Sequence, residues 1–282
     1  MNLVIGASGL IGSHLIGKFQ PCTGSYFSNP QPDLIPLDIT SYEETEKILH
    51  RLKPKNIFIP AAIPEVDHCE THEKETEKTN IHGLKNVLAA AKEFNPKIIY
   101  LSSEYVFDGK NGPYSEDDTP HPINIYGKQK LLAETLVQKR SNHIIVRTVW
   151  VYGKEDRRKN FMYAVIDRTK KKEKILVPLD EISNPTSAID LANALQKLVQ
   201  KNYVGIINVV GSERMSKFDF AKKIVELFDL PPHHLVPVES DSIPRAAKRP
   251  KNAGLKTDLL NSLGISMRSL EDNLQELKNN GV

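Results

Sequence analysis

The chain has 282 residues, 39% of them hydrophobic and 26% charged, which is enough to bury a substantial core. Its 38 Lys and Arg nearly balance 35 Asp and Glu, and the formal net charge of +3 argues against a nucleic-acid partner. Two cysteines exclude a disulfide framework, and no apolar run approaches the roughly 20 residues that span a bilayer. Because no apolar leader opens the sequence, we expect a cytoplasmic location and no membrane partner.

Short apolar runs alternate with helix-period segments along residues 2–153. In chain order the runs are NLVIG, GSYFS, LIPLDI, NIFIPAA, KIIYLSS and HIIVRTVWVYG. Helical segments are expected at 10–19, at about 42–52, in a stretch that ends near 94, and in one that runs through 139. This alternation is typical of a parallel sheet covered on both faces. We therefore predict an α/β fold with a Rossmann-like, doubly wound parallel sheet.

The character of the sequence changes after Gly153. Charged residues crowd the segment that follows, and residues 211–282 carry more proline and shorter apolar runs. Between these regions, AIDLANALQKLV and GIINVVG predict a helix and a strand that return to the main sheet. We therefore predict an NAD(P)-binding Rossmann domain of residues 1–152 and 186–210, and a smaller, discontinuous C-terminal substrate lobe of residues 153–185 and 211–282. The run RTKKKEK is interpreted as a solvated surface, with attraction of a diphosphate as the alternative.

The first strand leads into the sequence GASGLIG at the entry to a helix. Gly6 permits a sharp turn, Gly9 lets the backbone approach a pyrophosphate, and Gly12 allows close packing of helix on strand. Since this turn opens an alternating α/β chain, it predicts dinucleotide binding rather than a tight turn without a ligand. The predicted cofactor-binding residues are Gly6, Ser8, Gly9, Leu10, Ile11, Gly12, Ser28, Asp38, Ile39, Ala61, Ala62, Tyr126 and Lys130.

The end of the second strand bears on which dinucleotide is bound. NAD-selective folds usually place an acid there, which binds the ribose 2′-hydroxyl. Here Tyr26 is followed by Phe27, Ser28 and Asn29, with neither an acid nor an arginine. The absence of repulsion favours NADP(H), and use of NAD stays open. Asp38 is placed either to meet the adenine or to begin a helix.

Three polar side chains are expected where the later strands end. Ser103 closes KIIYLSS, and Tyr126 and Lys130 lie one turn apart on a predicted helix. A carbonyl that takes hydride needs a proton, which a free phenol with a pKa of about 10 holds too tightly near neutrality. Lowering that pKa to about 7 takes about 4 kcal/mol, which a nearby ammonium can supply while it also holds the nicotinamide ribose. We therefore predict that Ser103, Tyr126 and Lys130 are catalytic rather than surface residues of a helix.

The segment 101–134 resembles the stretch that marks dTDP-4-dehydrorhamnose reductases, a family of the extended short-chain dehydrogenases/reductases. Its sequence is LSSEYVFDGKNGPYSEDDTPHPINIYGKQKLLAE. The similarity extends over nearly the whole chain through the segments AAIPEVDHCE, VRTVWVYG, KNF, NPTSAIDLA and KRPKNAGL. The resemblance implies an NAD(P)H-dependent oxidoreductase that converts dTDP-4-dehydro-L-rhamnose to dTDP-L-rhamnose in polysaccharide biosynthesis. It implies a nucleotide-sugar site that includes Val66, Asp67, Ser103, Tyr105, Trp150 and Arg249. Trp150 is interpreted as a surface that stacks on the sugar, with core packing as the alternative.

Other interpretations of the resemblance stay open. The chain is also similar to the regulatory beta subunit of methionine adenosyltransferase, in the segments SSEYVFDG, GSERMSKFDFAKKI and RPKNAGL. This similarity implies a protein that binds NADP, has no turnover of its own and acts as the partner of another enzyme. Nucleotide-sugar epimerisation on the same fold is a third interpretation, and assembly as a homodimer is left open. The chain departs from the reductases at Pro60, where an asparagine or a similar polar residue is usual, and at Ile63, where an aromatic residue is usual.

A metal site is not predicted. His68, Cys69 and His72 lie close together in DHCETH, but the sequence offers no second half of a ligand set.

Overall fold

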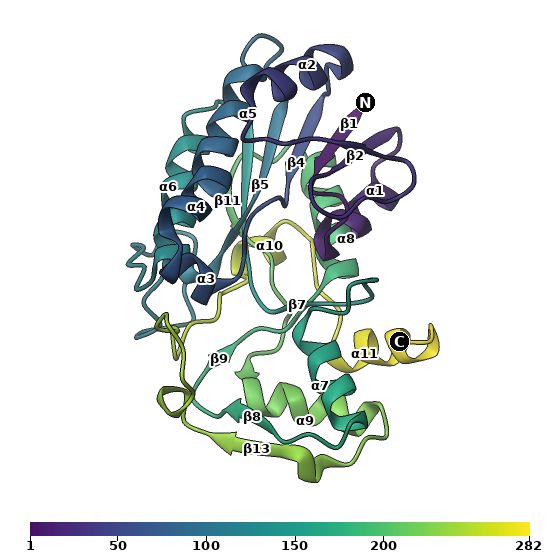
Figure 1. Cartoon of the computed structure of the whole chain (residues 1–282), viewed down its shortest axis with the longest axis vertical. Coiled ribbons are helices and arrows are strands. Elements are labelled where there is room, and N and C mark those ends of the chain that lie inside the picture. The colour runs from purple at the N-terminus through teal and green to yellow at the C-terminus, as the bar shows by residue number, and fades with distance from the viewer.

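The computed structural model describes residues 1–282. Its centre is a seven-stranded sheet of order β11-β6-β5-β4-β1-β2-β3, seen in the upper part of Figure 1. Every neighbouring pair in it is parallel. The strands are β1 (Asn2–Ile5), β2 (Cys22–Tyr26), β3 (Leu34–Pro36), β4 (Asn56–Ile59), β5 (Lys97–Ser103), β6 (His143–Thr148) and β11 (Gly205–Asn208). The predicted doubly wound parallel sheet is confirmed.

Helices cover both faces of this sheet (Figure 1). One face carries α1 (Leu10–Lys18) and α8 (Ala188–Gln200), and the other carries α2 (Tyr42–Leu52), α5 (Leu84–Ala90) and α6 (Ile125–Gln138). Successive residues of a strand point to opposite faces, so Val4 enters one buried cluster while Leu3 and Ile5 enter the other. Both faces are therefore buried, which explains why the strands read as continuous apolar runs.

The stretch predicted to end near residue 94 is divided into several short helices. These are α3 (Val66–Thr71), α4 (Glu73–Glu77), the π-helical turn η1 (Lys78–Gly83) and α5. His72 has φ −131° and ψ 49°, which breaks the helix between α3 and α4. In the π turn, the Asn80 amide donates to Gln129 Oε1 at 2.8 Å on α6. The turn therefore fastens this segment beside the helix that carries Tyr126.

The predicted run HIIVRTVWVYG does not form one strand. β6 ends at Thr148, and Trp150 has φ 42°, a backbone region that residues other than glycine rarely adopt. After this turn β7 (Val151–Tyr152) leaves the main sheet and pairs with β10 (Thr186–Ser187). The chain thus passes at Trp150 from the sheet into the lower part of the molecule.

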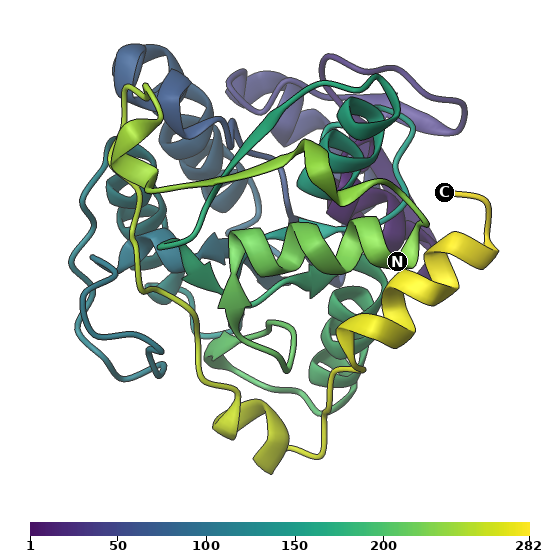
Figure 2. The same cartoon turned by 90° about the horizontal axis from the view of Figure 1, so that it is seen from below.

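Besides the β7–β10 pair, the lower part contains two more two-stranded sheets and three longer helices, seen from below in Figure 2. β8 (Ile175–Pro178) pairs with β13 (Leu235–Val238), and β9 (Ile182–Ser183) pairs with β12 (Met215–Ser216). The helices are α7 (Phe161–Lys170), α9 (Lys217–Leu227) and α11 (Leu270–Asn279), with the shorter elements η3 (Pro232–His234) and η4 (Ser240–Ser242). Two other short elements belong to the main body, where η2 (Glu104–Val106) packs on α6 and α10 (Asp258–Ser262) packs on β11. A buried cluster of 15 residues holds the lower part together. The division into two domains at the predicted residues stays a prediction.

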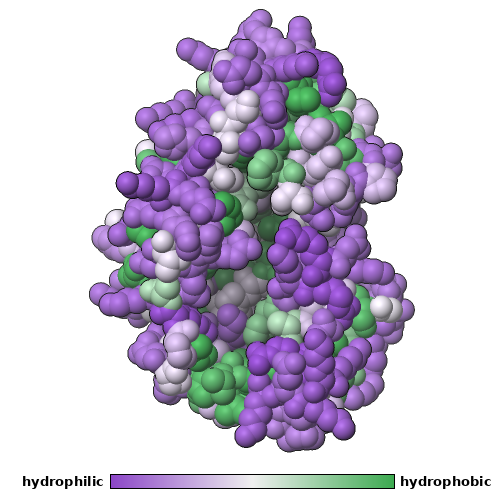
Figure 3. All heavy atoms as spheres, viewed as in Figure 1, coloured by the Kyte–Doolittle hydropathy of each residue, from purple (hydrophilic) through white to green (hydrophobic).

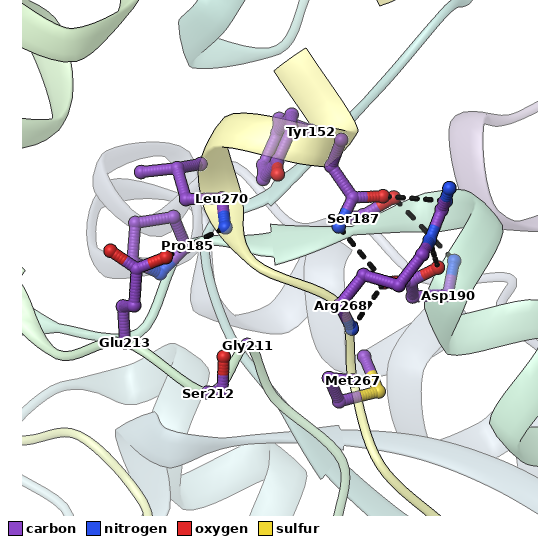
Figure 4. A pocket seen from close by; sticks show the side chains of 11 residues that line it. Tyr152, Pro185, Ser187, Asp190, Gly211, Ser212, Glu213, Met267, Arg268 and Leu270 are labelled. Atoms are coloured by element: carbon purple, nitrogen blue, oxygen red, sulfur yellow. Dashed lines mark hydrogen bonds and ion pairs between the residues drawn. The ribbon is translucent and has the colours of Figure 1, made fainter. Parts of the chain in front are cut away.

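Asp190 on α8 ties the C-terminal segment to the main body. Arg268 Nε donates to Asp190 Oδ1 at 2.8 Å (Figure 4), and Asn273 Nδ2 donates to Oδ2 at 2.9 Å. The pocket at this junction measures only about 10 Å³, which is room for about one water molecule. This contact therefore attaches the segment rather than binding a ligand. None of the helices combines the length and the hydrophobicity that crossing a membrane requires.

Candidate active site

A cleft of about 790 Å³ opens at the carboxyl ends of the main-sheet strands. In Figure 3 it is a hollow with apolar residues inside and a mostly hydrophilic rim. The strand order reverses between β1 and β4, and open α/β sheets bind ligands at such a switch point. Segments that contribute to the cleft include the turn after β1, the ends of β2, β4, β5 and β6, the start of α6, and residues 148–160.

The glycine turn forms one end of the cleft. Gly6 has φ 90°, and a Cβ added at Gly12 would lie 2.2 Å from the Gly6 carbonyl oxygen, so strand and helix meet more closely than any side chain allows. Gly9 caps α1 without a side-chain hydrogen bond, which leaves the first N–H groups of the helix open to an anion. Every residue predicted to bind the cofactor lines this cleft.

The far end of the cleft carries no basic side chain. Phe27 and Ser28 follow β2 there, and the Phe27 side chain is 71% exposed. Asp38 lines the cleft beside this segment, since Leu37 N donates to Tyr26 O at 2.9 Å, and its own Oδ1 accepts from Thr40 N at 2.8 Å. Asp38 does not begin α2, because the N-cap of that helix is Ser41, whose side chain accepts from Glu44 N. A contact of Asp38 with the adenine stays a prediction.

Ser103, Tyr126 and Lys130 are brought together on one wall of the cleft. Asn124 sets the start of α6, because its Oδ1 accepts from Gly127 N at 2.8 Å while its Nδ2 donates to Lys248 O at 2.9 Å. Tyr126 consequently lies in the first turn of the helix. Lys130 is 4% exposed, and its Nζ donates to the Leu101 carbonyl at 2.7 Å, 5.7 Å from the Tyr126 ring centroid.

Burial dominates the titration of this wall. It raises the pKa of Tyr126 well above that of a free phenol; Cys69 adds to the effect and the Ser103 hydroxyl opposes it. Burial also lowers the pKa of Lys130 to about 8, although Glu134 acts in the opposite direction. The expected lowering of the Tyr126 pKa is therefore not produced by the protein atoms, because desolvation dominates and Lys130, whose Nζ donates to the Leu101 carbonyl, is not among the groups that shift it.

The residues predicted to bind the sugar nucleotide fall into two groups. Val66, Ser103, Tyr105 and Trp150 line the cleft. The Tyr105 ring meets the Tyr126 ring edge-on, with centroids 5.8 Å apart. The strained turn at Trp150 points to function, because such backbone outliers cluster at functional sites.

Asp67 and Arg249 form the second group and do not line the cleft. They bind each other, with Arg249 Nη2 2.8 Å from Asp67 Oδ2 and Nη1 3.2 Å from Oδ1. Burial opposes ionisation of Asp67, but the hydrogen bonds from Arg249 and Ala247 N hold its pKa below the ordinary value. The pair ties α3 to the segment before residue 250, and a contact of either residue with substrate stays a prediction.

Several residues of the site were not predicted from the sequence. Arg157, Lys159 and Asn160 line the cleft from the loop before α7. Their charge-rich segment is visible in the sequence, but nothing in its spacing shows which side chains face inward. Glu104 follows Ser103 in the chain but does not line the cleft; its buried carboxylate accepts from Ser183 Oγ and Gly254 N. Burial raises its pKa to about 7.

The sequence DHCETH forms no ligand cluster. No group of three or more His, Cys, Asp and Glu side chains is arranged to hold a metal ion. The rings of His68 and His72 stack with centroids 4.4 Å apart, and the buried Cys69 thiol donates to Ile63 O.

Comparison with known proteins gives relatives over nearly the full length. The family model described as the RmlD substrate binding domain matches residues 1–281. The dTDP-4-dehydrorhamnose reductase of Aggregatibacter actinomycetemcomitans is 30% identical over 98% of this chain and 97% of its own length. Methionine adenosyltransferase 2 subunit beta of Rattus norvegicus is 31% identical over 95% of this chain and 83% of its own length. The crystal structure of dTDP-4-dehydrorhamnose reductase from Bacillus anthracis in complex with NADP has a TM-score of 0.89 at 30% identity, and covers 99% of this chain and 98% of that one.

Proposed function

The chain belongs to the RmlD substrate binding domain family, and on that premise we propose that it reduces the 4-keto group of a nucleotide-activated deoxysugar. Family and fold make it an NAD(P)-dependent oxidoreductase. The substrate that we propose is dTDP-4-dehydro-L-rhamnose, reduced to dTDP-L-rhamnose for polysaccharide biosynthesis. The observation that carries this proposal is that Ser103, Tyr126 and Lys130 open onto the same cleft as the glycine turn.

The residues of the cleft fit a dinucleotide. The first turn of α1 offers unpaired N–H groups, and no side chain stands between them and a pyrophosphate at Gly9. We assign the adenine end to Asp38 and Ile39, and the nicotinamide ribose to Lys130. NADPH is favoured over NADH because no acid follows β2. The bound cofactor supplies the hydride.

The protein's own residues supply the proton and the orientation. As hydride adds to the carbonyl carbon, the Tyr126 hydroxyl gives its proton to the carbonyl oxygen, and the product is a secondary alcohol. Ser103 donates a hydrogen bond to the same oxygen and so orients the carbonyl. The raised pKa keeps Tyr126 protonated before transfer, and an alkoxide is basic enough to take that proton.

The test follows absorbance at 340 nm with purified protein, NADPH or NADH, and dTDP-4-dehydrorhamnose generated in the cuvette. Tyr126→Phe should lower turnover by roughly 10²- to 10⁴-fold, the usual contribution of a general acid, with little change in the Kd for NADPH. Tyr42→Phe on α2 is the control, since Tyr42 lies outside the cleft. Turnover retained in Tyr126→Phe would remove Tyr126 from the mechanism.

One observation favours a second function, namely the 31% identity to a methionine adenosyltransferase beta subunit over 95% of this chain. In this function the chain binds NADP and serves as the partner of another enzyme without turnover of its own. A protein that binds NADPH, stays silent with the sugar nucleotide and retains a synthetase-type enzyme in a pull-down would support it. NAD that co-purifies tightly would instead support epimerisation on the same fold.

A further inference from the structure

The loop between β7 and α7 is held in a defined shape by Glu155. The Oε1 atom of Glu155 accepts from Lys159 N at 2.9 Å, Asn160 N at 2.7 Å and Asn160 Nδ2 at 2.8 Å. Asn160 Nδ2 also donates to the Gly153 carbonyl at 2.9 Å. Three N–H donors thus converge on one oxygen of the carboxylate, and Glu155 forms no ion pair with a neighbouring cation, so Glu155 shapes the loop.

Three consecutive cations on this loop have different surroundings. Arg158 turns to α7, where its Nε lies 3.0 Å from Asp167 Oδ2 and its guanidinium lies 3.9 Å from the Tyr163 ring centroid. Arg157 and Lys159, on either side of it, form no ion pair, and both line the cleft. The loop therefore separates one structural arginine from two free cations that face the cleft.

These two cations are the only uncommitted positive side chains of the cleft. The remaining basic residue that lines it, Lys130, donates to the Leu101 carbonyl. Helix α7 begins at Phe161, directly after the loop, and its N-terminus adds partial positive charge at the same place. This wall is therefore suited to a group that carries more than one negative charge.

We propose that Arg157 and Lys159 bind the diphosphate of the nucleotide-sugar substrate, an assignment that rests on the proposed function. The group recognised is a diphosphate ester, which both the sugar nucleotide and the cofactor carry. The glycine turn and the N-terminus of α1 are suited to bind the cofactor's diphosphate. The diphosphate of the sugar nucleotide needs a site of its own, and the cleft offers it no other free cation. Trp150 lies a few residues earlier on the same chain segment, which places the predicted sugar surface beside the predicted phosphate contacts.

The experiment measures binding of dTDP and of UDP by isothermal titration calorimetry, to NADPH-saturated protein and to protein without cofactor. The variants are Arg157→Gln, Lys159→Gln and the double variant, with Lys171→Gln as an exposed control outside the cleft. Each single variant should weaken nucleoside diphosphate binding by about tenfold, in line with loss of one charge-assisted hydrogen bond. The double variant should lose more and flatten the dependence on NaCl, while the Kd for NADPH stays within about threefold.

Three results would overturn the proposal. Unchanged nucleoside diphosphate binding in the double variant is the first, and failure of the wild-type protein to bind either dTDP or UDP is the second. The third is weakened NADPH binding with intact nucleoside diphosphate binding, which would assign the cations to the cofactor. Arg157→Lys and Lys159→Arg should restore most of the affinity if charge is what matters. A separate outcome distinguishes this inference from the proposed function. If the wild-type protein binds dTDP but does not oxidise NADPH, and the double variant loses dTDP binding, the phosphate assignment holds and the reductase function is rejected.

Discussion

Arg147 and Glu134 form a two-point ion pair in the interior of the protein. Nε and Nη2 of Arg147 lie 3.0 and 2.8 Å from the two carboxylate oxygens, and each side chain is 2% exposed. Ser102 Oγ donates to the same carboxylate. The pair joins β6 to α6 one turn after Lys130, so it fixes the helix that carries Tyr126 and Lys130 against the strand ends.

Removal of one partner of this pair should destabilise the protein strongly. Arg147→Met leaves the Glu134 carboxylate buried without its cation, and we expect a loss of about 3–5 kcal/mol in the free energy of unfolding. Urea denaturation measures the loss. The double variant Arg147→Met/Glu134→Leu should regain most of the stability, because it leaves no uncompensated charge. A single variant as stable as the wild type would show that the pair does not hold α6.

Gly12→Ala should damage the dinucleotide site. The added Cβ would meet the Gly6 carbonyl oxygen at 2.2 Å, and since this is backbone, α1 must move away from β1. We expect at least tenfold weaker NADPH binding and a stability loss of about 1–3 kcal/mol, as for overpacking in a core. Gly17→Ala is the matched control on the same helix, because nothing lies within 4 Å of its Cβ. It should stabilise by about 0.5 kcal/mol and leave binding unchanged. NADPH titration and urea denaturation distinguish these outcomes.

Glu104 should make stability depend on pH in the acidic range. Burial raises its pKa from 4.5 to about 7, so between these values the folded protein holds a proton that the unfolded chain has released. Stability from this group is therefore full below about pH 4.5 and declines as pH rises to 7, by on the order of 3 kcal/mol. Glu104→Gln should reduce this dependence in urea denaturation at pH 5 and 7.5. An identical pH dependence in the two proteins would contradict the assignment.

Lys130 should give NADPH binding an alkaline limit. Burial lowers its pKa to about 8, so the ammonium predicted to hold the nicotinamide ribose is lost as pH rises through that value. The Kd for NADPH should therefore increase above pH 8 in the wild type and stay flat in Lys130→Met. Stability should show the opposite trend: the unfolded lysine keeps its proton up to about pH 10.5, so between pH 8 and 10.5 this group alone favours folding as pH rises. Equal pH dependence of NADPH binding in both proteins would exclude Lys130 from this role.

The amino-acid sequence determined the features that depend on local order. Continuous apolar runs such as NIFI and KIIYLSS specify buried parallel strands, because a covered sheet needs apolar residues on both faces. The spacing of Gly6, Gly9 and Gly12 specifies the turn into α1, because its chemistry lies within seven residues of chain. Tyr126 and Lys130 share a helix wall for the same reason.

Tertiary structure alone decided the features that depend on distant neighbours and on desolvation. Asp67 and Arg249 are 182 positions apart, and only the fold shows that they pair with each other outside the lining of the cleft. Arg158 differs from Arg157 and Lys159 because Asp167 lies within its reach. The raised pKa of Tyr126 follows from burial, which no spacing of residues reports. The ion pairs depend on which side chains come within reach of each other, and the pKa depends on which atoms exclude water from the phenol. Both are settled only when the whole chain has folded.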